Sequence, residues 1–390
     1  MMGFGRTMLG EWHLEPETAY LNHGTVGATP RVVLEAQAAI HREIERHPSR
    51  FLLRELVPMV GAEREAKGRL RVAADTVGAV LGARGEDLAF VENTTTGINA
   101  VLRSFELGAG DEVLITDHTY GSVGRAAAYA CRRAGARVNT VTLPFPPQGG
   151  EEIVAVVAAA ITPRTRLAIL DHVVSDAAYV MPVAALVSCC RERDVRVLID
   201  GAHAPGMLEL EIAALDADWY VGNLHKWMFA PRGCAVLWAS EAAQAELHPA
   251  VISWGLDHGF NAEFDWTGTR DPSPYLAAPA GLDFLDRLGP GAVRAYNHAL
   301  ICEAARMLRR RWGAAPGVPE AMTGSMAVVE LPEHLEASAE AATRLRDTLL
   351  FEHRIEVPIM AWRERLWTRI SAQVYNEMAD FERLAAAVPG

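Results

Sequence analysis

The stretch VLIDGAHAPGMLELEIAALDADWYVGNLHKWMFAP (197–231) places a carboxylate and an amine where an α/β protein would bind a ligand. A short apolar run ends at Asp200, and a second one leads through Gly222 to Lys226. Both runs are typical of buried strands, and ligands of α/β sheets bind beyond the carboxyl ends of such strands. We therefore expect the acid and the amine to share one crevice.

Lys226 has the surroundings of a reactive lysine. Leu224 and Trp227 flank it, and Lys67 is the only other lysine in the 390 residues, so arginine supplies the other basic side chains. A lone lysine in a helical sequence is more often on the surface. An amine among apolar neighbours instead has a lowered pKa and can form a Schiff base with an aldehyde.

Asp200 and His203 each allow two interpretations. Asp200 could cap a helix or a turn. It could also pair with the cationic ring nitrogen of pyridoxal phosphate (PLP), a cofactor that acts as an electron sink. His203, three residues further on, is either an ordinary turn histidine or a contact to the phenolic oxygen of the same ring.

Three threonines in a row, Thr94 to Thr96, stand with Gly97 before a helix-like stretch. Free backbone N–H groups and hydroxyls at a helix start can hold a phosphate. Threonine-rich helix caps are also common, so this signal alone is weak. The chain lacks the P-loop, GxGxxG and GxSxG patterns, which argues against nucleotide, dinucleotide and serine hydrolase sites.

The elements that would position these residues alternate between strand and helix from residue 88 to residue 238. This alternation predicts an α/β fold with a mostly parallel sheet and helices on both faces. After residue 265 prolines and mixed patterns follow. We expect an N-terminal arm (1–16), a large ligand-binding domain (17–265) and a smaller α+β domain (266–390).

The composition and the net charge of the chain argue against several classes of partner and site. The net charge of −12 argues against nucleic acid, which needs a basic face. Five scattered cysteines without a CxxC pair predict neither a metal site nor a disulfide framework. No apolar run approaches about 18 residues, so we expect no membrane span. The N-terminus lacks the pattern of a signal peptide, and a cytoplasmic location is the expectation.

The chain resembles the fold-type I, class V aminotransferase-like PLP enzymes over nearly its full length, and within them the isopenicillin N epimerase-like branch. The resemblance implies a PLP cofactor and a seven-stranded type of sheet sandwiched by helices. The stretches that carry it are LNHGTVGATPR (21–31), FLLRE (51–55), NTTTGIN (93–99), DHTYGSV (117–123), DHVVS (171–175), DGAHAPG (200–206), GNLHKW (222–227), WTGTRD (266–271) and RISAQVYN (369–376).

Position by position, the resemblance implies separate roles at the cofactor ring. Lys226 would form the Schiff base and later move the proton at the substrate Cα. Asp200 would keep the pyridine nitrogen protonated, and His203 would contact the phenolic oxygen. Tyr120 would stack on the ring and take part in catalysis, with His118 as the second choice for the stacking position.

The resemblance also implies the residues around the rest of the ligand. Four side chains would hold the phosphate, namely Thr94, Thr95, Asn223 and His225. Thr269 would reach the phosphate of the other subunit, which implies a homodimer with shared sites. Arg369 would bind the substrate α-carboxylate with a fork of donors, and Asn22 and His23 would line the entrance.

Two departures from the family pattern bear on the reaction. No cysteine lies between Cys302 and the end of the chain, where cysteine desulfurases carry their nucleophile. Persulfide transfer is therefore disfavoured. Asp176 stands beside the cofactor where relatives usually have Asn, Thr or Gly, and we expect it to alter the ring electronics or the substrate pocket.

Several reactions stay open. The first hypothesis is a reaction that breaks a bond at Cα of a cysteine S-conjugate. It would lead either to C–S β-elimination or to decarboxylation-coupled oxidative deamination. Relatives in the same branch include enzymes of both kinds, among them enzymes of antibiotic biosynthesis. The second hypothesis is epimerisation, which needs a second acid/base opposite Lys226, such as Tyr120 or His23. Transamination is third. A non-catalytic protein of this fold is last, because Lys226, Asp200 and Arg369 are all retained.

Overall fold

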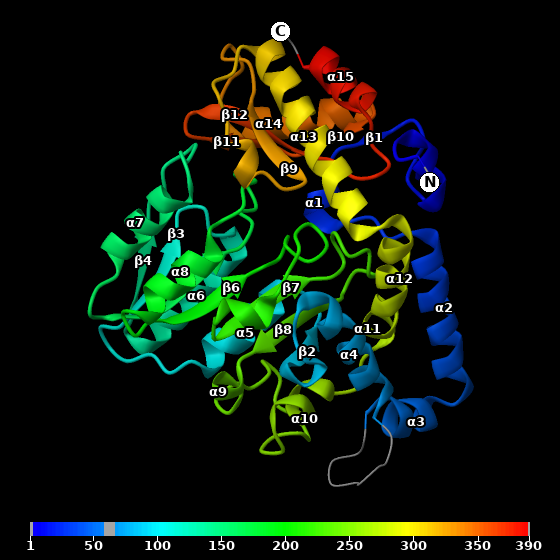
Figure 1. Ribbon diagram of the computed structural model, residues 1–390, viewed down its shortest axis with the longest axis vertical. Helices are drawn as coiled ribbons and strands as arrows, with labels where there is room; N and C mark the ends of the chain where they lie inside the picture. The colour runs from blue at the N-terminus through cyan, green and yellow to red at the C-terminus, as the bar shows by residue number, and fades with distance from the viewer. Residues whose placement is uncertain (1–2, 58–66, 389–390) are drawn as a thin grey trace.

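The computed structural model describes residues 3–57 and 67–388. A seven-stranded sheet forms the centre of the larger part of the molecule (Figure 1). Its order is β2-β8-β7-β6-β5-β3-β4; β8 runs antiparallel to both of its neighbours, and the other neighbouring pairs are parallel. The predicted mostly parallel sheet is confirmed. The strands are β2 (Leu88–Val91), β3 (Glu112–Thr116), β4 (Arg137–Val141), β5 (Thr165–Asp171), β6 (Arg196–Asp200), β7 (Trp219–Asn223) and β8 (Ala235–Ala239).

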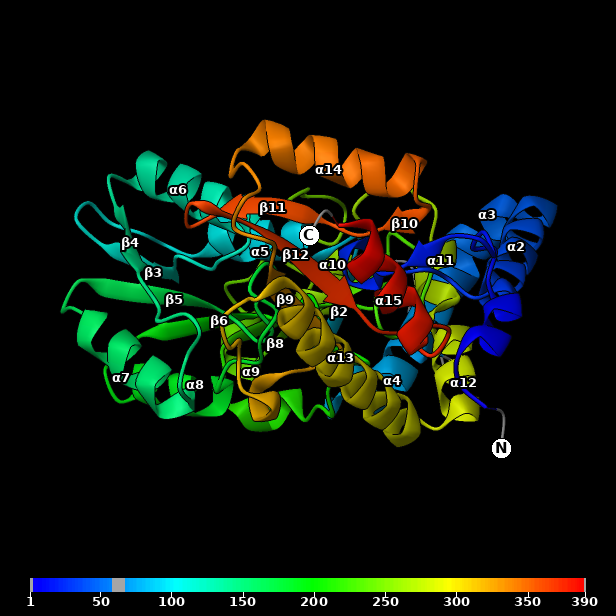
Figure 2. The same ribbon diagram turned by 90° about the horizontal axis from the view of Figure 1, so that it is seen from above.

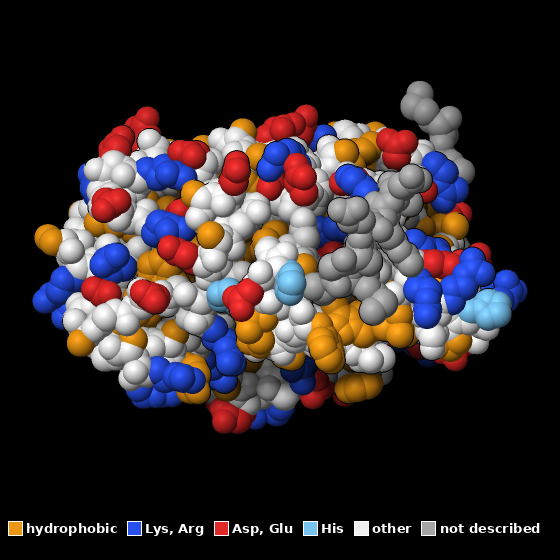
Figure 3. Space-filling view, turned by 90° about the horizontal axis from the view of Figure 1, so that it is seen from below, with side chains coloured by type: hydrophobic (Ala, Val, Ile, Leu, Met, Phe, Trp, Pro, Cys, Tyr) orange, Lys and Arg blue, Asp and Glu red, His pale blue; other side chains and the backbone are white. Residues whose placement is uncertain are grey.

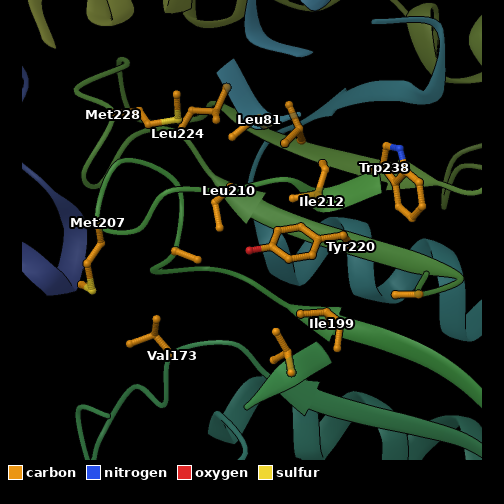
Figure 4. Close-up of a cluster of buried hydrophobic side chains, with 14 of the residues drawn as sticks. Leu81, Val173, Ile199, Met207, Leu210, Ile212, Tyr220, Leu224, Met228 and Trp238 are labelled. Carbon is orange, nitrogen blue, oxygen red and sulfur yellow. The ribbon is translucent and has the colours of Figure 1, made fainter. Parts of the chain in front are cut away.

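Helices cover both faces of this sheet, because successive side chains of a strand point to opposite faces. Leu198 of β6 and Val221 of β7 belong to one hydrophobic cluster, packed with α5 and α6. Their neighbours Ile199 and Tyr220 belong to another, which Figure 4 shows in close-up. The covering helices are α4 (Arg69–Leu81), α5 (Thr94–Ser104), α6 (Gly121–Ala134), α7 (Gly150–Ala160) and α8 (Val183–Arg191).

The smaller part has its own antiparallel sheet, in the order β11-β12-β9. Figure 2 shows these strands between α14 on one side and α13 with α15 on the other. The predicted smaller α+β region is thereby confirmed. Its elements are α13 (Pro290–Trp312), β9 (Met326–Glu330), α14 (Ala339–Phe351), β10 (Ile355–Glu356), β11 (Ile359–Trp362), β12 (Arg365–Ser371) and α15 (Met378–Ala387).

The N-terminal segment packs on both parts. A 3₁₀ turn over Arg6–Glu11 lies in the stretch that we expected to be irregular. Trp12 is buried edge-on against Phe229 and Tyr375. Strand β1 (Ala19–Tyr20) then pairs in parallel with β10. Residues just after the expected boundary at residue 16 therefore form a separate two-stranded sheet with β10 of the smaller part.

The expected boundary at residue 265 is likewise not marked by a break in packing, since α11 and α12 pack on α2 and α4. Among the described residues no helix is long and apolar enough to cross a membrane. The remaining helices are α1 (His23–Val26), α2 (Arg31–Arg46), α3 (Pro48–Arg50), α9 (Glu241–Gln244), α10 (Phe260–Asp265), α11 (Ser273–Leu276) and α12 (Ala278–Leu288).

Candidate active site

One pocket of about 470 Å³ lies at the carboxyl edge of the large sheet. Three neighbouring parallel strands end there in polar residues, β5 at Asp171, β6 at Asp200 and β7 at Asn223. Lys226 follows β7 by three residues and enters the same pocket. The sequence prediction that the acid and the amine share a crevice is confirmed by this arrangement.

Lys226 is an amine held largely out of water. Its residue is 8% exposed, and its Nζ lies 3.1 Å from Nε2 of His203. Burial, helped by the charge of Arg369, lowers the pKa of Lys226 to about 7, and the charge of Asp200 opposes the shift. A large share of the amine is therefore unprotonated at neutral pH, which is the form that attacks an aldehyde.

Asp200 and His203 present groups that a ligand ring can use. Asp200 is 3% exposed, and one of its carboxylate oxygens accepts a hydrogen bond from the N–H of Ala202 at 3.0 Å. Burial raises the pKa of Asp200, while Ala202 and the charge of Lys226 oppose the rise. Burial lowers the pKa of His203 well below its usual value, so the ring is neutral. Its Nδ1 is buried without a hydrogen-bond partner among the described residues, which is costly unless a ligand supplies one.

Residues expected to hold a phosphate lie where β2 leads into α5. Asn93 caps the helix by accepting the N–H of Thr96 at 3.0 Å, and Asn223 accepts the N–H of Thr94 at 3.0 Å. The hydroxyl of Thr95 lies 3.1 Å from that of Ser122. The positive end of a helix dipole with hydroxyls around it suits a phosphate.

His225 lies at the same end of the pocket. Its Nδ1 lies 3.0 Å from the carbonyl oxygen of Cys234. That contact fixes Nδ1–H as a donor, so Nε2 is the acceptor of a neutral ring. Burial lowers the pKa of His225 to about 4, which keeps the imidazole neutral at physiological pH. All four expected phosphate residues thus line the same pocket, although the neutral His225 ring presents an acceptor, and it would have to be protonated to donate to a phosphate oxygen.

Arg369 of β12 also lines the pocket and is buried. Its Nη1 donates to the carbonyl and the hydroxyl oxygens of Ser175, both at 3.0 Å, and its Nη2 donates to the hydroxyl of Thr25 at 2.6 Å. Burial lowers the pKa of Arg369, and the charges of Asp176 and Tyr120 oppose this. Two hydroxyl residues thus hold the planar fork in place.

Tyr120 and Asp176 also line the pocket, and both are exposed. Tyr120 stands just before α6 and is 46% exposed. His118, the second choice for the stacking position, is buried among Phe145, Tyr179 and Trp362 and is not part of the pocket wall. Of the two, Tyr120 is placed to meet a ligand.

Two expected entrance residues do not line the pocket. His23 is 0% exposed, with one ring nitrogen 2.8 Å from the Tyr375 hydroxyl and the other 3.0 Å from the carbonyl oxygen of Lys226. Asn22 donates to Glu356 at 2.9 Å. The expectation for His23 and Asn22 is wrong in this structure, because the helical turn α1 brings the next residues, including Thr25, to the pocket instead.

Thr269 is exposed and lies outside the pocket of its own chain. The expected contact to a partner subunit therefore stays a prediction. The site also contains four polar residues to which we had assigned no role, namely Thr25, Asn93, Asp171 and Ser175. Asp171 gave a usable signal, since it ends an apolar run as Asp200 does.

The family model for aminotransferase class-V matches residues 20–384. The chain belongs to the class V aminotransferase family. It is 32% identical to an L-cysteine desulfhydrase of Arabidopsis thaliana, over 96% of this chain and 88% of that protein. It is 33% identical to an isopenicillin N epimerase of Streptomyces clavuligerus, over 97% of this chain and 96% of that protein.

Among solved structures, a cystine C–S lyase in complex with cysteine persulfide has the same fold, with a TM-score of 0.78 and 23% identity. That match covers 95% of this chain and 97% of the other. The cofactor of this class V enzyme is PLP. The site fits it, with an amine for the aldehyde, a carboxylate and an unpartnered imidazole nitrogen for the ring, and a helix start for the phosphate.

Proposed function

We propose that this PLP enzyme is a C–S lyase that acts on L-cysteine or on a thioether conjugate of it. The observation that carries the proposal is that the pocket holds one buried amine with a lowered pKa, Lys226, and one oriented guanidinium, Arg369, at the cofactor and substrate ends. An anchor for the α-carboxylate and a single base are what removal of the Cα proton requires.

Each residue has a defined task in this reaction. Bound PLP supplies the electron sink that makes the bonds at Cα labile. Arg369 binds the α-carboxylate, and the Ser175 and Thr25 hydroxyls keep its fork in place. Lys226 accepts the Cα proton, and the sulfur leaves as a thiolate that then takes up a proton. With one water, a cysteine thioether gives pyruvate, ammonium and a thiol, which balances the atoms.

Epimerisation is the alternative, and two relatives carry that activity in their names. It requires a second acid/base on the face opposite Lys226. His23 was one candidate, but both of its ring nitrogens are engaged, and burial lowers its pKa to about 4. Tyr120 is the candidate that remains. Because His23 is not available as the second acid/base, elimination is favoured over epimerisation.

Cysteine desulfuration stays disfavoured. All five cysteines lie in the described part of the chain and are buried. None of them lines the pocket. Persulfide transfer needs a thiolate that reaches the substrate sulfur, and burial raises the pKa of Cys234 and Cys190 instead.

The decisive experiment is to incubate the PLP-loaded enzyme in deuterated water with L-cysteine, S-alkyl cysteines and isopenicillin N. Pyruvate and a thiol in equal amounts are the expected products. Deuterium at Cα without cleavage would instead assign an epimerase. An aldehyde with CO₂ would assign the decarboxylative route, and a keto acid that retains its sulfur would assign transamination.

We further propose a homodimer with shared sites, in a cytoplasmic enzyme. Thr269 is exposed and away from its own pocket, as a residue that serves the partner's phosphate would be. The preceding surface segment exposes Val251, Ile252 and Leu256, and Trp254 is 83% exposed. Several hydrophobic side chains lie on the underside of the molecule in Figure 3. A second copy would cover this apolar segment.

Light scattering on the eluted protein tests the dimer. Trp254→Glu should give a monomer with weakened PLP binding. Phe351→Glu changes another exposed aromatic residue, 77% exposed on α14 in the small domain, and should leave a dimer. A wild-type protein that elutes as a monomer with full PLP affinity would contradict the shared site.

A further inference from the structure

Asp171 and Asp200 form a pair of buried carboxyl groups at the floor of the pocket. They end the neighbouring parallel strands β5 and β6 and are register partners. The N–H of His172 donates to the carbonyl of Asp200 at 2.8 Å, which locks the two strand ends together. Neighbouring strands lie about 4.8 Å apart, and register partners point to the same face. Both aspartates are 3% exposed, and both line the pocket.

Among the described residues, the groups that shift the pKa of Asp171 include no positively charged side chain. The charges that act on it belong to the carboxylates Asp200 and Asp176, and the Thr119 hydroxyl is its hydrogen-bonding neighbour. The phenol of Tyr179, from the loop after β5, lies near Asp171, and its hydroxyl is buried without a partner among the described residues. Burial and then Asp200 raise the pKa of Asp171 well above its usual value.

Asp200 has better support for a negative charge. It accepts the N–H of Ala202, and the amine of Lys226 acts on it. Two carboxylates that share a buried site do not both ionise, and the better supported member keeps the charge. The two aspartates are therefore unequal although their strand positions match.

We propose that Asp171 is a neutral carboxylic acid at working pH, so that the pair carries one negative charge. Asp171 is then a positioning residue, which keeps the ionised Asp200 turned toward the ring nitrogen of PLP. A doubly charged pair would instead draw in water or protonate Asp200 and weaken its contact with the ring. This inference rests on the cofactor and is independent of the C–S lyase reaction, so a failure of that reaction leaves it standing.

Infrared spectroscopy of the holoenzyme tests the protonation state directly. The difference spectrum of wild type minus Asp171→Asn should contain the C=O band of a neutral carboxylic acid at pH 7. That band should disappear as the pH rises through the raised pKa of Asp171. A difference spectrum that shows only carboxylate bands at pH 7 would overturn the proposal.

The positioning role is tested by PLP affinity and by the pH profile of the visible absorption of bound PLP. Asp171→Asn, neutral and of the same shape, should keep the affinity within about threefold and leave the pH profile in place. Asp171→Leu should weaken binding about tenfold or more and shift the profile, since the neutral polar group beside the charged Asp200 is replaced by an apolar one. Rescue by Asn and loss with Leu together support the role.

Two further variants separate this role from simple loss of folding. Asp218→Asn changes another buried carboxylate at the same sheet, which is bound to Arg196 outside the pocket. It should reduce stability without moving the pH profile. Thr119→Val should move the Asp171 infrared transition to higher pH, because the Thr119 hydroxyl lowers the pKa of Asp171.

The results that would overturn the role are definite. Asp171→Asn that shifts the pH profile as far as Asp200→Asn would mean that Asp171 is ionised. Asp171→Leu with wild-type affinity and profile would mean that it positions nothing. If Asp171→Leu does not fold, the infrared transitions of wild type and Thr119→Val still decide the protonation state.

Discussion

The two ends of the pocket are built in different ways. The cofactor end comes from one sheet, where Asp200, Asn223 and Lys226 stand at or just beyond neighbouring strand ends. The substrate end is assembled from distant segments: Thr25 follows β1, Ser175 follows β5, and Arg369 belongs to the small sheet. One end is thus local in the fold, and the other depends on how the two parts of the chain meet.

This difference teaches which property each end controls. Strand ends of a packed sheet are rigid, so they suit the cofactor, whose geometry is the same in every turnover. The residues of the substrate end come from separate segments, so each side chain can be replaced without altering the large sheet. Substitutions at the cofactor end should therefore change PLP binding and chemistry, and those at the substrate end should change KM and selectivity.

The largest effect is expected from Lys226→Ala. Loss of both the Schiff base and the Cα base should lower kcat by at least about 10⁴-fold. Borohydride reduction followed by mass spectrometry should attach PLP to Lys226 in the wild type and to no residue in the variant. Attachment at Lys67, the other lysine, would show that the cofactor end is misassigned.

Arg369→Lys should lower kcat/KM about 100-fold while PLP affinity stays within about threefold. A lysine keeps the charge but loses the fork that Ser175 and Thr25 hold, and a disrupted buried charge contact costs about 3 kcal/mol. Steady-state kinetics and PLP titration measure the two quantities. A loss of PLP affinity as large as the loss of kcat/KM would contradict the proposal that the two ends control different properties.

Asn223→Ala should do the opposite, weakening PLP about fivefold with KM nearly unchanged. The side chain accepts the N–H of Thr94 at the start of α5, and one such bond contributes about 1 kcal/mol. Asn139→Ala removes an asparagine of β4 that bonds to Ala160 away from the pocket, and it should leave PLP affinity unchanged.

The smallest effect is expected from Asp176→Asn. The exposed carboxylate should favour substrates with a cationic side chain, as an exposed ion pair contributes up to about 1 kcal/mol. The ratio of kcat/KM for S-(2-aminoethyl)-L-cysteine over S-propyl-L-cysteine should fall about fivefold. Asp283→Asn, an exposed carboxylate on α12, serves as the control. An unchanged ratio would remove Asp176 from substrate selection.

The sequence predicted the cofactor end well because its signals are local. An apolar run that ends in Asp200, and a lysine just beyond the next run, define strand ends without knowledge of distant contacts. The substrate end was predicted only in part. Arg369 came from the family resemblance, whereas Thr25 and Ser175, which orient it, became visible once three segments were brought together.

The positions of two residues, His23 and Asp171, were not predicted from the sequence, and each failure has a physical cause. His23 was expected at the entrance from the family resemblance, but helix α1 places it inward, against Tyr375 and the backbone of Lys226. Asp171 carried the same pattern as Asp200. What makes it unusual is the register of two strands, and a single sequence does not state which strands are neighbours.

The pairing of β1 with β10 sets an order of events during synthesis. Residues 19–20 leave the ribosome early, but their partners at 355–356 are made more than 300 residues later. Long-range pairing of this kind forms late. The strands of the large sheet, which end by residue 239, can assemble before that. The PLP-binding part of the chain is therefore expected to fold first. Arg369 can meet Ser175 and Thr25 only after the last strands are released.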